Sequence, residues 1–99
     1  MDVPMTTRAD RIEAALRRQF SPAVLMVRDD SHLHAGHAGA SASGETHYAV
    51  TMVAGGFDGQ SRVARSRAVH AALADEFANG LHALSLTLRT ASEHAIIGA

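Results

Sequence analysis

The segment from Phe57 to Leu88 constrains the fold most, because it combines signals for a turn, a helix and a strand in sequence. Phe57-Asp58-Gly59 is typical of a turn, and Asn79-Gly80 is a helix stop signal. Between them an apolar stripe recurs every four residues, as expected for a helix with one buried face, at Val69, Leu73 and Phe77. A run that alternates in polarity follows and predicts a half-buried strand whose core residues are Leu84, Leu86 and Leu88. His82 therefore lies between a helix end and a strand start.

The flanking segments predict the rest of a small α+β domain. Thr7 and Asp10 have the spacing of a capping box, and the helix that they begin has Ile12, Leu16 and Phe20 on one face and ends at Ser21-Pro22. Strands are expected at Val24–Val27 and Thr46–Val53, and a second capping box, Thr90 to Glu93, begins a short terminal helix. The helix after Ser61 can be broken near Arg65. Residues 1–99 are thus expected to form a single domain, with a three-stranded mixed sheet covered by helices on one face.

A loop of small residues connects the first two strands. Ser31 to Glu45 is rich in Gly, Ala, Ser and His and fits no regular period, which indicates a flexible loop. A plain hairpin needs only about two to five residues at this place. Long loops inside compact domains are more often functional than not, so this loop is a candidate site.

Composition excludes several classes of function. The chain has no cysteine, so it can form no disulfide and offers no thiolate ligand or nucleophile. No apolar run is long enough to span a membrane, and the first residues lack the features of a signal peptide, so we expect a cytoplasmic protein. A net charge of −1 argues against strong non-specific binding to nucleic acid. Seven histidines are the unusual feature, four of them between His32 and His47.

Several short motifs, in this order and spacing, resemble the BolA family over nearly the whole chain. They are Asp30-Ser31-His32 with His34, Gly44-Glu45-Thr46-His47-Tyr48, Phe57-Asp58-Gly59, Arg65-Ser66-Arg67 and Leu81-His82-Ala83-Leu84-Ser85-Leu86. The resemblance implies a class II KH-like fold, αββααβ with a terminal helix. It also implies a non-enzymatic role, because BolA proteins pair with monothiol glutaredoxins and share a [2Fe–2S] cluster with them, and several are described as transcriptional regulators.

The same resemblance implies a metal-ligand set. The family uses a His just before the third strand, here His82, and a His or Cys in the loop between the first two strands, here His34 or His37. Neutral imidazole is a suitable ligand for iron, and histidine ligation of an iron–sulfur cluster has a precedent in Rieske centres. Because the chain has no thiolate, a partner must supply the remaining ligands, and no cluster is expected on the isolated protein. We interpret His47 as structural, hydrogen-bonded to the neighbouring loop.

Two other functions compete with this adaptor role. Arg62, Arg65 and Arg67, expected to be exposed on one helix, could contact the phosphates of DNA in a transcriptional regulator, although a solvated face fits the near-neutral charge better. The family's usual Arg-His-Arg is Arg65-Ser66-Arg67 here, so any role of the central His is absent. An enzyme, or a site for a small-molecule substrate, is not indicated. Asp29 and Asp30 are adjacent and point to opposite sides of a strand, and Ser41 and Ser43 have no base beside them.

Overall fold

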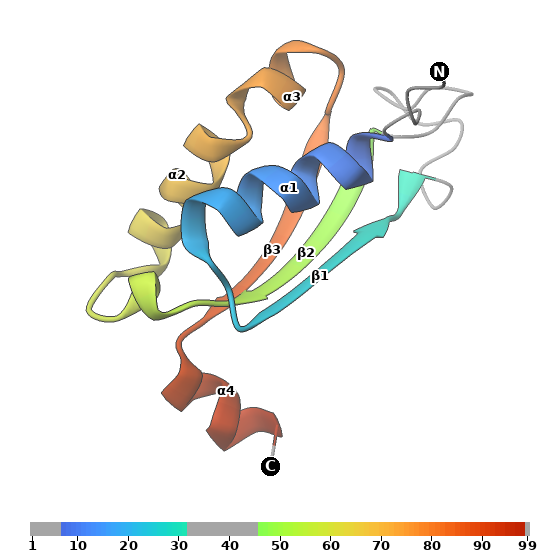
Figure 1. Cartoon of the computed structure of the whole chain (residues 1–99). Coiled ribbons are helices and arrows are strands. Elements are labelled where there is room, and N and C mark those ends of the chain that lie inside the picture. Colours follow the sequence, from blue (N-terminus) through green and yellow to red (C-terminus); the bar gives the residue numbers. More distant parts are fainter. Residues whose placement is uncertain (1–6, 32–45, 99) are drawn as a thin grey trace, which may run out of the picture.

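The computed structural model describes residues 7–31 and 46–98, which form three strands and four α-helices (Figure 1). In chain order the elements are α1 (Arg8–Phe20), β1 (Val24–Asp29), β2 (His47–Val53), α2 (Arg62–Ala72), α3 (Ala74–Ala78), β3 (Ala83–Arg89) and α4 (Ala91–Gly98). A single turn of 3-10 helix, Gly55–Phe57, leads from β2 toward α2. The αββααβ order with a terminal helix is confirmed.

The sheet has the order β1-β2-β3 and is mixed, as predicted. β1 runs antiparallel to β2, and β3 runs parallel to β2. Helices α1, α2 and α3 lie on one side of the sheet, whereas α4 projects beyond the end of β3 (Figure 1). On the side away from these three helices, Met26 of β1 is 65% exposed.

The core lies between the sheet and the helices. Tyr48, Val50 and Met52 of β2 point toward the helices and are at most 2% exposed, which follows from the two-residue period of a strand. The helices contribute Ile12 and Leu16 from α1, and Val69 and Leu73 from the second helical segment. The predicted apolar stripes therefore meet on one face of the central strand.

Caps fix the ends of α1 as the sequence predicts. Thr7 accepts a hydrogen bond from the Asp10 backbone N–H at 3.1 Å, and Asp10 accepts one from the Thr7 N–H at 3.2 Å. At the other end, Ser21 adopts a left-handed conformation with φ 45° and donates its N–H to the Arg17 carbonyl. This conformation turns the chain toward β1.

Three expectations about local structure were wrong. The helical segment breaks at Leu73 rather than near Arg65, because Leu73 leaves the helical conformation with φ −108° and ψ 17° while its side chain stays buried. β1 extends to Asp29, two residues beyond the expected end. The three β3 leucines, predicted as core residues, pack against the core but are only partly buried, since β3 lies at an edge of the sheet.

Arg65 is the largest correction, because its side chain was expected on the solvent-facing side of the helix and is buried. Its guanidinium donates hydrogen bonds to the Gln60 and Leu88 carbonyls and to both carboxylate oxygens of Glu93, the shortest at 2.7 Å. It also lies over the ring of Phe57, 5.7 Å from the ring centre. Arg65 thus joins α2, β3 and α4.

Glu93 makes the stability of the protein depend on pH. The hydrogen bond from Arg65, followed by the one from the Thr90 backbone N–H, lowers the pKa of Glu93 from 4.5 to about 2. A group whose pKa is lowered by folding stabilises the fold fully above its unfolded value, and this contribution is lost as the pH falls from about 4.5 to about 2. We expect Glu93→Gln to lower the melting temperature at pH 7 and to flatten its decline over this window.

Thermal unfolding followed by circular dichroism between neutral pH and pH 2 tests this expectation. Glu13→Gln is the control, because Glu13 forms an exposed ion pair with Arg17 one turn away within α1. If Glu93→Gln and Glu13→Gln change the pH profile equally, Glu93 has no special role.

Candidate functional site

His82 is the predicted ligand that the structure describes, and it lies at the entry to β3. Its side chain is exposed, whereas its backbone is fixed, because the His82 N–H donates to the Thr46 carbonyl at 2.8 Å. The next residue, Ala83, donates to the same carbonyl at 3.1 Å. An exposed imidazole is thus held on a backbone that cannot easily shift.

The His47 ring packs against the His82 ring. The two ring centres are 5.3 Å apart with an interplanar angle of 52°. His47 is 8% exposed, and its Nδ1 lies 2.9 Å from the Thr46 hydroxyl, within hydrogen-bonding distance. This contact agrees with the predicted structural role of His47, and the buried ring gives His82 a fixed neighbour.

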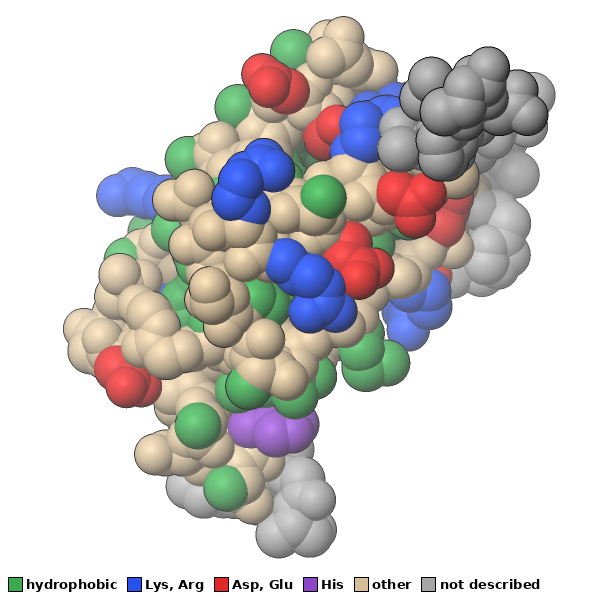
Figure 2. Space-filling view, in the orientation of Figure 1, with side chains coloured by type: hydrophobic (Ala, Val, Ile, Leu, Met, Phe, Trp, Pro, Cys, Tyr) green, Lys and Arg blue, Asp and Glu red, His purple; other side chains and the backbone are tan. Residues whose placement is uncertain are grey.

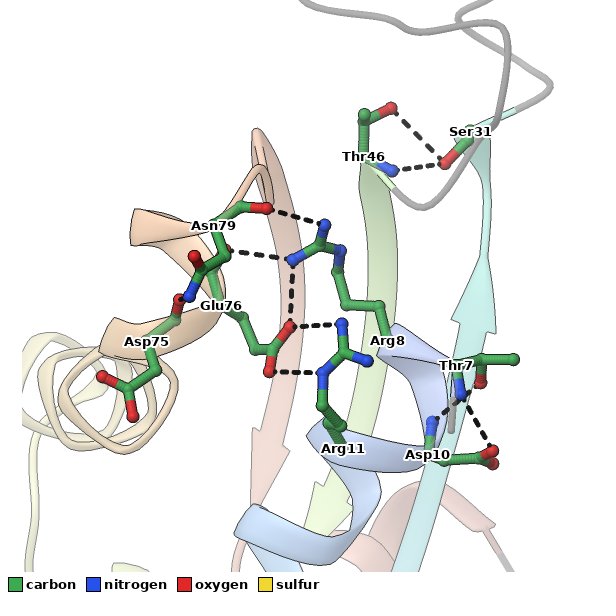
Figure 3. Close-up of polar contacts among 9 residues, drawn as sticks. All are labelled: Thr7, Arg8, Asp10, Arg11, Ser31, Thr46, Asp75, Glu76 and Asn79. Atoms are coloured by element: carbon green, nitrogen blue, oxygen red, sulfur yellow. Dashed lines mark hydrogen bonds and ion pairs between the residues drawn. The ribbon is translucent and has the colours of Figure 1, made fainter. Parts of the chain in front are cut away.

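Ser31 links this site to the end of β1. Its hydroxyl oxygen accepts the backbone N–H of Thr46 at 2.8 Å (Figure 3). It also accepts the backbone N–H of His47 at 3.1 Å. Asp29 in turn accepts the Ser31 N–H at 2.8 Å. Ser31 and Thr46, which border the segment 32–45, are therefore joined directly to each other, and Thr46 is joined to His82.

Sequence reasoning assigned no role to Ser31, although a signal was present. An Asp two residues before a Ser, at the end of a predicted strand, is the pattern of a turn in which the Asp side chain caps the backbone N–H. What the sequence does not indicate is that the Ser31 hydroxyl meets a strand 15 residues later.

A second network fixes the site from the side of α1. Arg8 donates hydrogen bonds to the carboxylate and the carbonyl of Glu76, at 2.9 and 3.1 Å, and to the Asn79 carbonyl at 3.0 Å (Figure 3). Arg11 adds a second contact to the Glu76 carboxylate at 2.9 Å. The Glu76 carbonyl also accepts the Leu81 N–H at 2.9 Å, so the network extends to the residue before His82.

Glycine is required in this network. Gly80 has φ 118°, a conformation that side chains rarely adopt, and a Cβ at this position would lie 3.0 Å from the Arg8 guanidinium. The predicted stop signal Asn79-Gly80 thus does more than end α3, because it lets Arg8 reach the Asn79 carbonyl.

The other predicted ligands, His34 and His37, lie outside the described residues. Among the residues that the structure describes, no three of His, Cys, Asp and Glu lie close enough together to hold a metal ion. The described chain thus presents His82 as one exposed nitrogen ligand, and ligation by His82 stays a prediction.

The three arginines of the DNA-binding alternative are not equivalent. Arg62 and Arg67 are exposed on α2, but the Arg65 guanidinium is engaged by Glu93 and two carbonyls. On the face shown in Figure 2, acidic and basic side chains are interspersed rather than gathered into a patch of one charge. The engagement of Arg65 removes one predicted phosphate contact. The mixed charges on this face give no support to DNA binding.

Comparison with known proteins identifies the family. The model of the BolA-like protein family matches residues 16–93. The chain belongs to the BolA-like family. It is 42% identical over 88 residues to protein BOLA1, chloroplastic, of Arabidopsis thaliana, covering 87% of this chain and 55% of that protein. It is also 40% identical over 95 residues to SufE-like protein 1, chloroplastic/mitochondrial, of the same plant, covering 92% of this chain and 26% of the relative.

A solved structure confirms the BolA-like fold. The BolA domain of SufE1 from Arabidopsis thaliana superposes with a TM-score of 0.81 and 39% identity, over 90% of this chain and 98% of that domain. The two curated relatives are considerably longer than the matched region, so the similarity concerns the BolA-like portion of each.

Location in the cell stays a prediction. The names of these relatives refer to chloroplasts and mitochondria, so they lend no support to the expected cytoplasmic location. No helix in the described ranges has both the length and the apolar character needed to cross a membrane.

Proposed function

We propose that this BolA-like protein is a non-enzymatic adaptor that docks against a monothiol glutaredoxin and contributes His82 to a [2Fe–2S] cluster shared with it. Its role would be the trafficking of iron–sulfur clusters or the sensing of iron. The observation that carries the proposal is the exposed imidazole of His82, held on a fixed backbone at the start of β3.

The side chains of this protein can supply ligands to one iron of such a cluster. An imidazole nitrogen is a suitable iron ligand, and with no cysteine the chain must leave the thiolate ligands to a partner. When bound, the cluster would supply a redox-active iron centre whose potential depends on its histidine ligands. The protein itself contributes neutral imidazole, since a protonated ring cannot bind metal.

The second ligand is proposed to be His34 or His37. His34 follows Ser31 by three residues, and Ser31 is joined through Thr46 to the backbone of His82. Three residues of extended chain span at most about 10 Å, so the covalent chain limits how far His34 can lie from Ser31. His37 follows Ser31 by six residues and can reach farther.

Visible circular dichroism tests the proposal. The protein is mixed with a monothiol glutaredoxin that holds a [2Fe–2S] cluster, beside the variants His82→Ala, His34→Ala and His37→Ala. We expect the wild type to change the cluster spectrum and His82→Ala to abolish the change, because one imidazole ligand is lost. The loop variant that also fails identifies the second ligand.

His70→Ala is the matched control, because His70 of α2 is also exposed but its ring stacks on that of Phe77 in α3. It should behave like the wild type. Binding to the cluster-free glutaredoxin, measured by calorimetry, separates docking from ligation and should survive His82→Ala. A wild-type spectrum from His82→Ala would rule out His82 as a ligand.

A further inference from the structure

The outer edge of β3 carries backbone groups that point away from the sheet. Within the described residues β3 pairs only with β2. The Leu88 carbonyl accepts a hydrogen bond from Arg65 of α2, so it faces outward, whereas the Arg89 carbonyl accepts from Ala54 and faces inward. Because backbone direction alternates along a strand, the N–H and C=O of Leu86 and the N–H of Leu88 also face outward.

A hollow lies along this edge. Its volume is about 460 Å³, and it is lined by Arg62, Arg65 and Ser66 of α2, by residues 86–89 of β3 and by Glu93 of α4. We call it the β3 groove. Most of its lining comes from α2 and β3, whose places in the fold are labelled in Figure 1. The groove therefore joins a free strand edge to a helix surface.

The groove is positively charged. Arg65 and Glu93 neutralise each other at 2.7 Å. Arg62 and Arg89 also line the groove, and no hydrogen bond or ion pair within the described part of the chain joins either of them to an acid. Two cations thus remain to meet a ligand, one on the α2 side and one on β3.

We propose that the β3 groove binds an extended acidic segment of a partner protein, which adds a strand to the free edge of β3. Addition of a strand satisfies the outward N–H and C=O of Leu86 and the N–H of Leu88 through main-chain hydrogen bonds, while the Leu88 carbonyl keeps its bond from Arg65. Adjacent residues of a strand point to opposite sides, so two consecutive acidic residues place one carboxylate near Arg62 and the other near Arg89. This surface is separate from the cluster site, because His82 and Arg89 lie at opposite ends of β3, roughly 20 Å apart.

Two other occupants fit the groove less well. Single-stranded nucleic acid is usually held by aromatic side chains that stack on bases, and no aromatic residue lines the groove. A second copy of the chain, paired edge to edge, would bring the Arg62 and Arg89 cations of both copies into one interface. An acidic peptide meets both the backbone and the charge requirements.

A synthetic peptide with the central sequence Val-Glu-Glu-Val, flanked by threonine and serine, is the probe. We expect it to bind by fluorescence polarisation, and in NMR spectra to shift the Leu86 and Leu88 amide signals and slow their hydrogen exchange. A peptide with lysine in place of glutamate, and one N-methylated on the central backbone amides, should not bind.

The double variant Arg62→Glu with Arg89→Glu should weaken binding about 10- to 100-fold, since two solvent-accessible ion pairs with the peptide are lost and replaced by repulsion. Arg18→Glu, the same type of substitution at one exposed site on α1, should bind like the wild type. His82→Ala should also bind like the wild type, so that failure of the cluster proposal and failure of this one are distinguishable.

Several results would overturn the proposal. Equal binding of the lysine peptide would exclude charge recognition, and equal binding of the N-methylated peptide would exclude strand addition. Peptide-induced shifts confined to another surface would place the site elsewhere. If a single-stranded oligonucleotide shifts the Leu86 and Leu88 signals and the peptide does not, the ligand is nucleic acid. Self-association that protects these amides without peptide would identify a second copy as the occupant.

Discussion

Replacement of Phe57 by alanine is expected to destabilise the protein by about 3–5 kcal/mol, as is typical when a buried aromatic side chain is removed from a core. Phe57 is fully buried, and its ring packs on that of Phe20 with 5.5 Å between the ring centres. It also supports the Arg65 guanidinium on its face. Since domains of this size are stable by only about 5–15 kcal/mol, the loss takes a large part of the total.

Urea denaturation followed by far-ultraviolet circular dichroism measures this effect. Phe77→Ala is the control, because Phe77 is half-buried and stacks on exposed His70, so its removal should cost clearly less. Equal urea midpoints of unfolding for the two variants would contradict the expectation that the buried Phe57 ring contributes more to stability than the half-buried Phe77 ring.

Replacement of Glu76 by alanine is expected to cost about 2–3 kcal/mol, because it removes the carboxylate that both Arg8 and Arg11 contact. The Arg8 and Glu76 side chains are only 11% and 13% exposed, so water compensates little for the lost ion pair. Arg8 also holds the Asn79 carbonyl, so we expect the segment that leads to His82 to loosen as well.

Asp75→Ala is the matched control, since Asp75 is the neighbouring acid in α3 and is exposed. Its removal changes the net charge equally and should cost far less in urea denaturation. Hydrogen exchange at the Leu81 and His82 amides should quicken in Glu76→Ala and stay unchanged in Asp75→Ala. Unchanged exchange in both would show that the network does not hold the site.

Local signals predicted most of the elements. The capping boxes at Thr7 and Thr90, the alternating pattern of β2 and the stop signal at Gly80 each depend on residues close in sequence, so they can be interpreted without the fold. The position of His82 between a helical segment and β3 follows from the same signals and is confirmed.

Contacts between distant segments could not be predicted in this way. Glu93 was recognised as a capping residue, but its partner Arg65 lies 28 residues earlier, and only packing brings the two together. The same contact buries Arg65, which was expected to be exposed because it is charged, although it lies four residues before Val69 on the same helical stripe. The half-burial of Leu86 depends on the order of strands in the sheet, and a single alternating run does not reveal which strand lies at an edge.

Because Ser31 and Thr46 are hydrogen-bonded to each other, the stability of the sheet depends little on the number of residues between them. The Ser31 hydroxyl closes both ends of this segment with hydrogen bonds that involve none of residues 32–45. Doubling the length of a flexible connection costs only about 0.6 kcal/mol in closure entropy. Residues can therefore be inserted, deleted or exchanged between Ser31 and Thr46 at little cost, while the hydrogen bonds that hold the backbone of His82 stay the same.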